Sequence, residues 1–196
     1  QRLTTALDIQ KAPKEAVSKA YDVFQKANIQ RSGTGFTGTP ILTPDELDRS
    51  KGEISWNDLE TMLSGFAYDT YYNHSETSRQ NYFTVWDFAI DQGFSFGSGM
   101  GTNHHYGYQV RKIYTTAWLM RNAIWKAPNR DNILSTLIFW SALQETRQPY
   151  QYGRDELLDS WHTLLMAKTV SALLFTDERE RVRALKGLSR WVSSSL

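Results

Sequence analysis

The sequence contains no cysteine in its 196 residues. That absence excludes disulfide bonds, thiolate zinc sites and cysteine nucleophiles. Apolar runs are short, and none reaches the roughly eighteen residues that a membrane-spanning helix needs, so we predict no membrane partner. Histidine is scarce, with four residues in the chain. Two of them, His104 and His105, are adjacent, which raises the question of what the pair does.

Charges are unevenly divided along the chain, although the net charge is only +1. Residues 1–100 carry 9 basic and 13 acidic side chains, whereas residues 101–196 carry 13 and 8. A basic second half suits an anionic partner, and a solvated helix surface accounts for it equally well. Aromatic residues reach 13%. Stacking surfaces and large side chains packed in a core both remain open as explanations.

Apolar residues recur at helical spacing along most of the chain, and capping residues separate the repeats. The expected helices run from Pro13 to near Asn28, from Thr43, from Ser55, from Ser75 to a left-handed cap at Gly93, from about Tyr108 to before Pro128, and from Asp131, Asp155 and Asp177. No segment alternates with period two for long enough to predict a strand. The predicted fold class is therefore all-α, with helices in antiparallel succession.

Two glycine-rich segments, residues 31–40 and 93–102, interrupt the helices. The first contains Gly33-x-Gly35-x-x-Gly38, which matches the dinucleotide fingerprint. The context does not match, because a helix precedes the motif and prolines follow where a helix should begin. We therefore predict no nucleotide cofactor and interpret both segments as long functional connections.

The adjacent histidines, His104 and His105, follow the second glycine-rich segment. Helical metal pairs are usually four residues apart, and adjacent side chains project about 100° apart, so we predict no metal site. No nucleophile elbow accompanies the pair. Polar recognition or proton transfer in a cleft remains, because imidazole titrates near neutral pH. Two surface histidines at a helix N-terminus fit the spacing as well.

The neighbours of the pair offer groups that bind an acidic sugar. Asn103 supplies an amide, Tyr106 and Tyr108 supply phenols and flat faces, and Arg111 supplies a forked cation for a carboxylate or sulfate. Together these groups would form a surface that binds a sugar acid. No nucleic-acid-binding motif is present, so we predict no nucleic-acid partner.

Residues 91–120, DQGFSFGSGMGTNHHYGYQVRKIYTTAWLM, resemble the start of the catalytic domain of the chondroitin, hyaluronate and xanthan lyases, polysaccharide lyase family 8. The run from Thr102 to Tyr108 is most similar to the broad-specificity chondroitin sulfate ABC lyases. The resemblance implies an incomplete α/α toroid, in which antiparallel helical hairpins surround a cleft for the polyanion. It also implies that residues 1–196 are the first part of this domain in a longer multidomain lyase, in the bacterial periplasm or secreted.

Two departures from the family affect the implied site. The family's Asn-Trp-Trp stacking patch is replaced by Asn103-His104-His105, so stacking passes to other aromatics, with Tyr106, Trp118 and Trp161 as candidates. The family's later Gly-Ala-Asn segment is also missing, and His162 is the candidate replacement for its amide.

The resemblance implies a lyase that cleaves chondroitin and dermatan sulfate, which are anionic polysaccharides, by β-elimination. We predict no cofactor. The resemblance assigns the glucuronate chemistry to a His and a Tyr that we expect beyond residue 196, so this chain would supply one wall of the cleft. His104 or His105 is then predicted to be the base for iduronate, whose C5 proton lies on the opposite ring face. The alternative is a non-catalytic helical module that binds polyanions or carbohydrate.

Overall fold

The structure is a computed structural model that describes residues 13–39, 56–92 and 106–145, together with five positions between 179 and 189 that are helical. It describes the backbone alone at Trp56, 106–111 and 138–145. The elements are α2 (Lys14–Ala27), β1 (Gln30–Ser32), β2 (Gly35–Thr37), α3 (Trp56–Asn73), α4 (Glu76–Asp91), α5 (Tyr106–Leu119), α6 (Arg121–Lys126) and α7 (Arg130–Glu145). The predicted helices from Thr43 and Asp155 lie outside the described residues.

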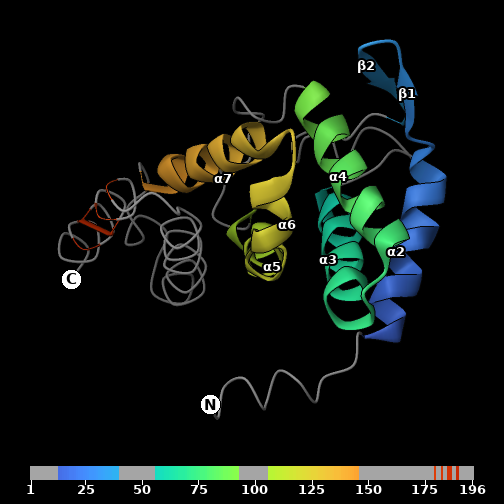
Figure 1. Ribbon diagram of the computed structural model, residues 1–196, viewed down its shortest axis with the longest axis horizontal. Coiled ribbons are helices and arrows are strands. Elements are labelled where there is room, and N and C mark those ends of the chain that lie inside the picture. Colours follow the sequence, from blue (N-terminus) through green and yellow to red (C-terminus); the bar gives the residue numbers. More distant parts are fainter. Residues whose placement is uncertain are drawn as a thin grey trace.

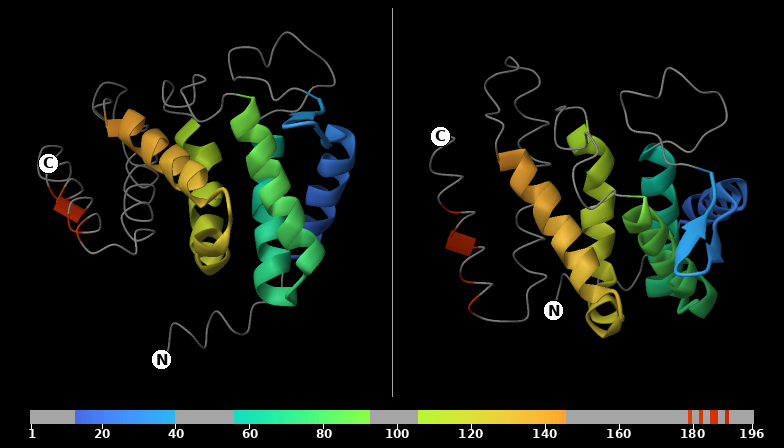
Figure 2. Two further views of the ribbon diagram at one scale, coloured as in Figure 1. Left: turned by 45° about the horizontal axis from the view of Figure 1, so that its top comes forward. Right: turned by 90° about the horizontal axis from the view of Figure 1, so that it is seen from above.

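Helix α3 is central to the described part of the chain, because it contacts α2, α4 and α5. Figure 1 and both views of Figure 2 show the α3–α4 pair between α2 on one side and α5, α6 and α7 on the other. The predicted all-α class is confirmed. The closure of such hairpins into an incomplete α/α toroid stays a prediction.

Helix α2 begins and ends where its capping residues predict. Pro13 precedes it in an extended conformation, at φ −63° and ψ 104°. Asn28 ends it in the left-handed region, at φ 48°, and its N–H donates to the Gln25 carbonyl at 3.2 Å. Asparagine tolerates this conformation because its short polar side chain bonds locally.

A short β-hairpin follows α2, where the sequence predicted only a connection. Strands β1 and β2 pair antiparallel, with Arg31 opposite Phe36 and Ser32 opposite Gly35. Gly33 makes the turn at φ 61°, a conformation that glycine adopts without steric penalty. Three-residue strands are too short for a period of two to be visible in a sequence. The glycines of the dinucleotide-like motif therefore belong to an antiparallel hairpin.

Helices α3 and α4 form an antiparallel hairpin whose turn is closed by side chains. The Ser75 hydroxyl accepts the Ser78 N–H at 3.2 Å, which confirms the predicted cap. The Asp69 carboxylate accepts the Ser78 hydroxyl at 2.5 Å and the Asn73 amide at 2.7 Å. At the other end, α4 stops at Asp91, and the cap residue is Gln92 at φ −79°. The predicted cap, Gly93, lies outside the described residues.

The single helix predicted before Pro128 is divided in two at Met120, which separates α5 from α6. The Met120 carbonyl accepts the N–H groups of Ala123 and Ile124, both at 2.9 Å, so the backbone stays bonded through the bend. Helix α6 stops before Pro128, as expected. The predicted cap at Asp131 is wrong, because α7 begins at Arg130 and the Asn129 carbonyl accepts the N–H groups of Asn132 and Ile133, at 3.1 and 3.2 Å.

The core is aromatic as well as aliphatic. Its largest fully buried side chains are Trp86, Tyr82, Tyr114, Phe66 and Phe88. In the described part of the chain, much of the aromatic content is therefore packing rather than exposed stacking surface. Among the same residues, no helix is both long enough and apolar enough to cross a membrane.

Candidate functional site

The structure describes only some of the predicted site residues. Tyr106, Tyr108 and Arg111 lie in the first two turns of α5, where the backbone alone is described. The other predicted residues, Asn103, His104, His105, Trp161 and His162, lie outside the described residues. The described part of the candidate site is therefore the start of α5 and the elements that anchor this helix.

Helix α5 is the element that follows the histidine pair, since it begins at Tyr106, one residue after His105. The first N–H groups of a helix have no partner inside the helix, and together with the macrodipole they favour anions. Helix α5 has 14 residues, and Arg111 is the sixth of them. The local backbone is thus electrostatically suited to a carboxylate or a sulfate.

Two contacts on opposite sides fix α5. The Lys112 ammonium lies 3.1 Å from the Glu60 carboxylate of α3, and the Glu60 side chain is only 11% exposed. On the other side, the buried Tyr114 hydroxyl donates to the Leu137 carbonyl of α7 at 2.6 Å. Ile113 and Ala117 are fully buried between these contacts. The helix that carries Tyr106, Tyr108 and Arg111 is therefore held by an ion pair, a buried hydrogen bond and the core.

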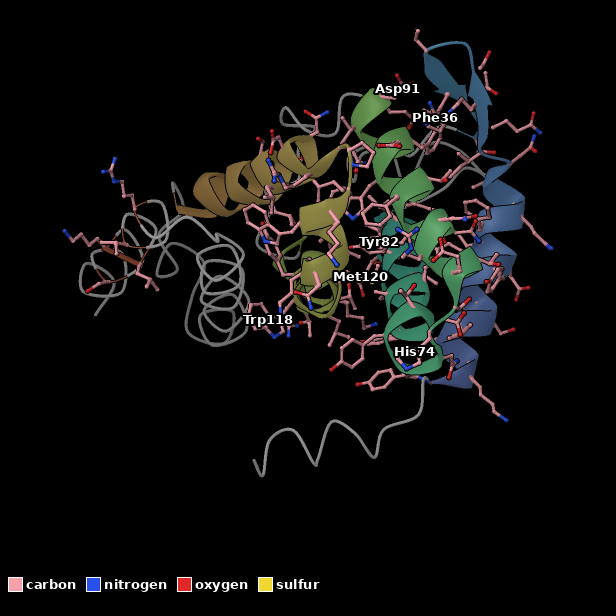
Figure 3. All side chains as sticks on the ribbon, in the orientation of Figure 1. Phe36, His74, Tyr82, Asp91, Trp118 and Met120 are labelled. Atoms are coloured by element: carbon pink, nitrogen blue, oxygen red, sulfur yellow. The ribbon has the colours of Figure 1, made fainter. Side chains whose placement is uncertain are left out.

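The end of α4 is anchored by the β-hairpin. The Asp91 carboxylate accepts the Phe36 N–H at 3.1 Å, and a Cβ at Gly35 would lie only 3.2 Å from it. Figure 3 shows Asp91 and Phe36 at this end of α4, and His74 at the other. Sequence reasoning did not identify this contact.

Asp87, one turn before Asp91, links the hairpin to Asn129, the residue that precedes α7. It accepts a hydrogen bond from the Asn129 amide, and the Arg31 guanidinium lies 3.8 Å from it. Burial raises the pKa of the Asp87 carboxyl above its ordinary value, while Asn129 and Arg31 act in the opposite direction. The Arg31 guanidinium also covers the Phe36 ring at 5.1 Å. The two aspartates therefore connect the end of α4 to both strands of the hairpin and to Asn129.

Trp118, a candidate for stacking, lies at the far end of α5 from Tyr106. The Arg121 guanidinium covers its ring at 4.4 Å and donates to its carbonyl at 2.8 Å. Twelve residues of helix separate Trp118 from Tyr106, which is roughly 18 Å. The structure therefore does not bring these two aromatic residues together.

Two hollows border the described helices. One, of about 380 Å³, lies among α2, α3 and α5 and includes Lys19 and Lys112. The other, of about 510 Å³, lies where the ends of α3 and α5 meet. No group of three His, Cys, Asp or Glu side chains that could hold a metal ion occurs in the part of the chain that the structure describes.

Comparison with known proteins identifies relatives along most of the chain. A chondroitin sulfate ABC exolyase of Bacteroides thetaiotaomicron is 31% identical over 196 residues, which cover 91% of this chain and 19% of that protein. A chondroitin sulfate ABC endolyase of Proteus vulgaris is 27% identical over 204 residues, which cover 94% of this chain and 20% of that protein. A chondroitin sulfate ABC exolyase of Proteus vulgaris is 25% identical over 113 residues, 56% of this chain and 11% of that protein.

The chain thus spans about a fifth of the length of the first two relatives. The family described as "Lyase, catalytic" matches residues 1–196. Because this match extends over the entire chain, the protein belongs to the family of lyase catalytic domains.

Proposed function

We propose that this chain is part of a glycosaminoglycan lyase that cleaves chondroitin sulfate and dermatan sulfate, and that it supplies one wall of the substrate cleft. The observation that carries the proposal is the family match over the whole chain, joined to the similarity with chondroitin sulfate ABC lyases. The basic second half supports it, because the substrate is a polyanion. The parent lyase, periplasmic or secreted, contributes the remainder of the site and of the toroid.

The proposed reaction is a β-elimination at the uronic acid. A base removes the C5 proton, which is acidic because it lies α to the uronate carboxylate. The electron pair forms the C4=C5 double bond as the C4–O4 bond breaks, and an acid protonates the leaving oxygen. Negative charge that develops on the carboxylate has to be stabilised by positioned donors or cations.

The residues that lead into α5 would meet these requirements for iduronate. His104 or His105 acts as the base, and Asn103, Tyr108 and Arg111 bind the uronate. Tyr106 and Trp161 contact the sugar rings, and His162 replaces the family's amide at the uronate carboxylate. The positive end of α5 and its anchoring by Glu60 support this assignment, because charge stabilisation works best when the donors are held in place before reaction.

The test is to replace His104 and His105 by alanine, one at a time, in the full-length enzyme. The absorbance of the unsaturated product is followed on chondroitin sulfate and on dermatan sulfate separately. We expect one variant to lose on the order of a hundredfold or more of its activity on dermatan sulfate, since a general base contributes about that factor. Activity on chondroitin sulfate should fall much less.

The control is Gln25→Ala, which changes an exposed residue of α2 and should leave both activities unchanged. Equal, small losses of activity on the two substrates would mean that the histidines are surface residues without a catalytic role. Salt-sensitive binding of the polyanion with no product at any enzyme concentration would instead favour the non-catalytic binding module.

A further inference from the structure

The larger hollow lies away from the entry to α5. Its lining comes from the end of α3 and the turn after it, and from the junction of α5 and α6: Thr70, Tyr71, Tyr72 and His74, and residues 119–123. Leu119 is thirteen residues along α5 from Tyr106, or roughly 20 Å of helix. The hollow is therefore separate from the helix terminus next to the histidine pair. Figure 3 labels His74 and Met120, which border it.

The hollow contains a positioned cation. Arg121 is half-buried, its guanidinium lies over the Trp118 ring at 4.4 Å, and its Nη1 donates to the Trp118 carbonyl at 2.8 Å. No carboxylate of the described residues pairs with it. A guanidinium has five N–H donors, so most remain for a ligand. The carboxylates nearest in sequence to His74 are engaged elsewhere, Asp69 with Ser78 and Glu76 with Arg79.

Aromatic side chains line the same hollow. Tyr71 and Tyr72 are half-buried and meet edge to face, with ring centroids 5.0 Å apart. Tyr68 stacks on Tyr72 at 6.5 Å. Burial raises the pKa of the Tyr72 phenol, and the neighbouring Tyr71 and Tyr68 act in the same direction. The Tyr72 phenol therefore stays protonated and can donate a hydrogen bond.

The aromatic side of the hollow is rigidly framed. His74 is exposed and adopts a left-handed conformation at φ 55°, which is uncommon for a residue with a side chain. The buried Asp69 holds the turn through Ser78 and Asn73, and the Tyr21 hydroxyl of α2 lies 2.7 Å from the Ser78 hydroxyl. Strained residues persist where the surrounding contacts determine them, and they concentrate at binding sites.

From this arrangement we infer that the hollow between the ends of α3 and α5 is a second binding site, for an acidic saccharide unit. The sugar ring packs against Tyr71 and Tyr72, the uronate carboxylate or sulfate pairs with Arg121, and His74 and Asn122 meet the hydroxyl groups. Forked guanidinium pairing and aromatic contact together distinguish such a unit from a simple anion. The inference goes beyond the proposed function, because it requires no cleavage and none of the residues that lead into α5.

The test is a calorimetric titration of the full-length protein with an unsaturated chondroitin sulfate disaccharide, which has no linkage left to eliminate. All the proteins compared also carry His104→Ala and His105→Ala, so that the proposed catalytic site contributes less to the measured binding. Arg121→Gln should weaken the remaining binding about tenfold, as expected when one charge-assisted contact is lost. The matched control is Arg79→Gln, because Arg79 pairs with Glu76 on the surface of α4, outside the hollow. It should leave the affinity unchanged.

The inference is overturned if Arg121→Gln and Arg79→Gln bind alike. It is also overturned if inorganic sulfate binds with the same affinity and the same dependence on Arg121, because the site would then be an anion site only. Should Arg121→Gln fail to fold, Tyr71→Leu and Asn122→Ala leave the contact between Arg121 and Trp118 in place, and unchanged affinity in both would contradict the inference. Loss of catalysis in the histidine variants tests the proposed function alone, since the titration involves no bond cleavage.

Discussion

The two ends of the α3–α4 hairpin are both held by aspartates, but in different ways. At the His74 end, Asp69 is buried and accepts the Ser78 hydroxyl and the Asn73 amide, at 2.5 and 2.7 Å. At the opposite end, Asp91 is exposed and accepts the Phe36 N–H at 3.1 Å. One carboxylate is enclosed with several donors, whereas the other makes an exposed contact with a short hairpin.

The Asp69 end of the α3–α4 hairpin therefore stabilises the fold, whereas the Asp91 end lies next in sequence to the predicted catalytic residues. A buried carboxylate with several donors is costly to disturb, because its partners would lose hydrogen bonds away from water. An exposed contact opens locally at little cost to the whole structure. The rigid end frames the hollow at Tyr71, Tyr72 and His74, and the exposed end precedes the segment that carries the histidine pair.

Displacing α2 from α3 should disturb both ends at once, since Tyr21 of α2 contacts Ser78 and the hairpin follows α2 directly. A Cβ at Gly65 would lie 2.4 Å from the Ala20 Cβ and 2.5 Å from the Ala16 carbonyl oxygen. Backbone atoms cannot yield at that distance, so Gly65→Ala should cost about 3 kcal/mol of unfolding free energy. Urea unfolding followed by far-UV circular dichroism measures the loss.

Gly33→Ala is the control for Gly65→Ala, because it also adds one methyl group. Gly33 has a φ of 61° and no atom within 4 Å of an added Cβ, so only backbone strain is introduced. We expect a cost of about 1 kcal/mol, confined to the hairpin turn. If the two variants lose equal stability, close packing of α2 on α3 is not what Gly65 provides.

Asp69→Asn changes only the end of the α3–α4 hairpin near His74. Burial opposes ionisation of Asp69, but hydrogen bonds from Ser78, Asn73 and Ser75 outweigh it and lower the pKa of the carboxyl below its ordinary 3.8. A lowered pKa means that the ionised form stabilises the fold above about pH 4, and that this contribution is lost as the pH falls through the lowered pKa. The variant should therefore lose about 2 kcal/mol at neutral pH, and the difference from the unchanged protein should shrink in acid.

Asp87→Asn is the matched comparison from the other end of α4. Burial raises the pKa of this carboxyl above 3.8, against Asn129 and Arg31, so the ionised form is the less favoured one in the folded protein. The unchanged protein should then gain stability relative to this variant as the pH falls toward the raised pKa, which is the opposite trend to Asp69. Urea midpoints at a series of pH values test both. The same trend for both aspartates would remove the distinction between the two ends.

The sequence predicts the helices well where local chemistry decides. Pro13, Asn28 and Ser75 act on the backbone within one turn, and the helix boundaries that they predict are confirmed. Predictions from the sequence are less accurate where contacts between distant residues determine a helix boundary. Asn129, whose amide is held by Asp87, lies before the first residue of α7, so Asp131 falls inside that helix.

The candidate site is divided in the same way. A motif and a family resemblance predicted the residues around the start of α5, and the structure describes the backbone of Tyr106, Tyr108 and Arg111 in that helix. The hollow could not be predicted, because Tyr72 and Arg121 are distant in the sequence and each is an ordinary partly exposed helix residue. They line one hollow because α3 and α5 run in the same direction. Glu60 near the start of α3 pairs with Lys112 of α5, and the ends of both helices border the hollow.

Asp91→Asn should have the smallest effect and tests the exposed end alone. The substitution removes the charge that accepts the Phe36 N–H, but an asparagine oxygen can still accept a weaker bond, so global stability should fall by less than about 1 kcal/mol. The local effect should be larger: hydrogen exchange at the Phe36 amide should accelerate several-fold, because the hairpin opens without the core. Asp22→Asn, an exposed change on α2, should leave that amide unchanged. Slower or unaltered exchange at Phe36 in Asp91→Asn would mean that contacts other than the carboxylate hold the hairpin against α4. The contrast between the two ends would then depend on Asp69 alone.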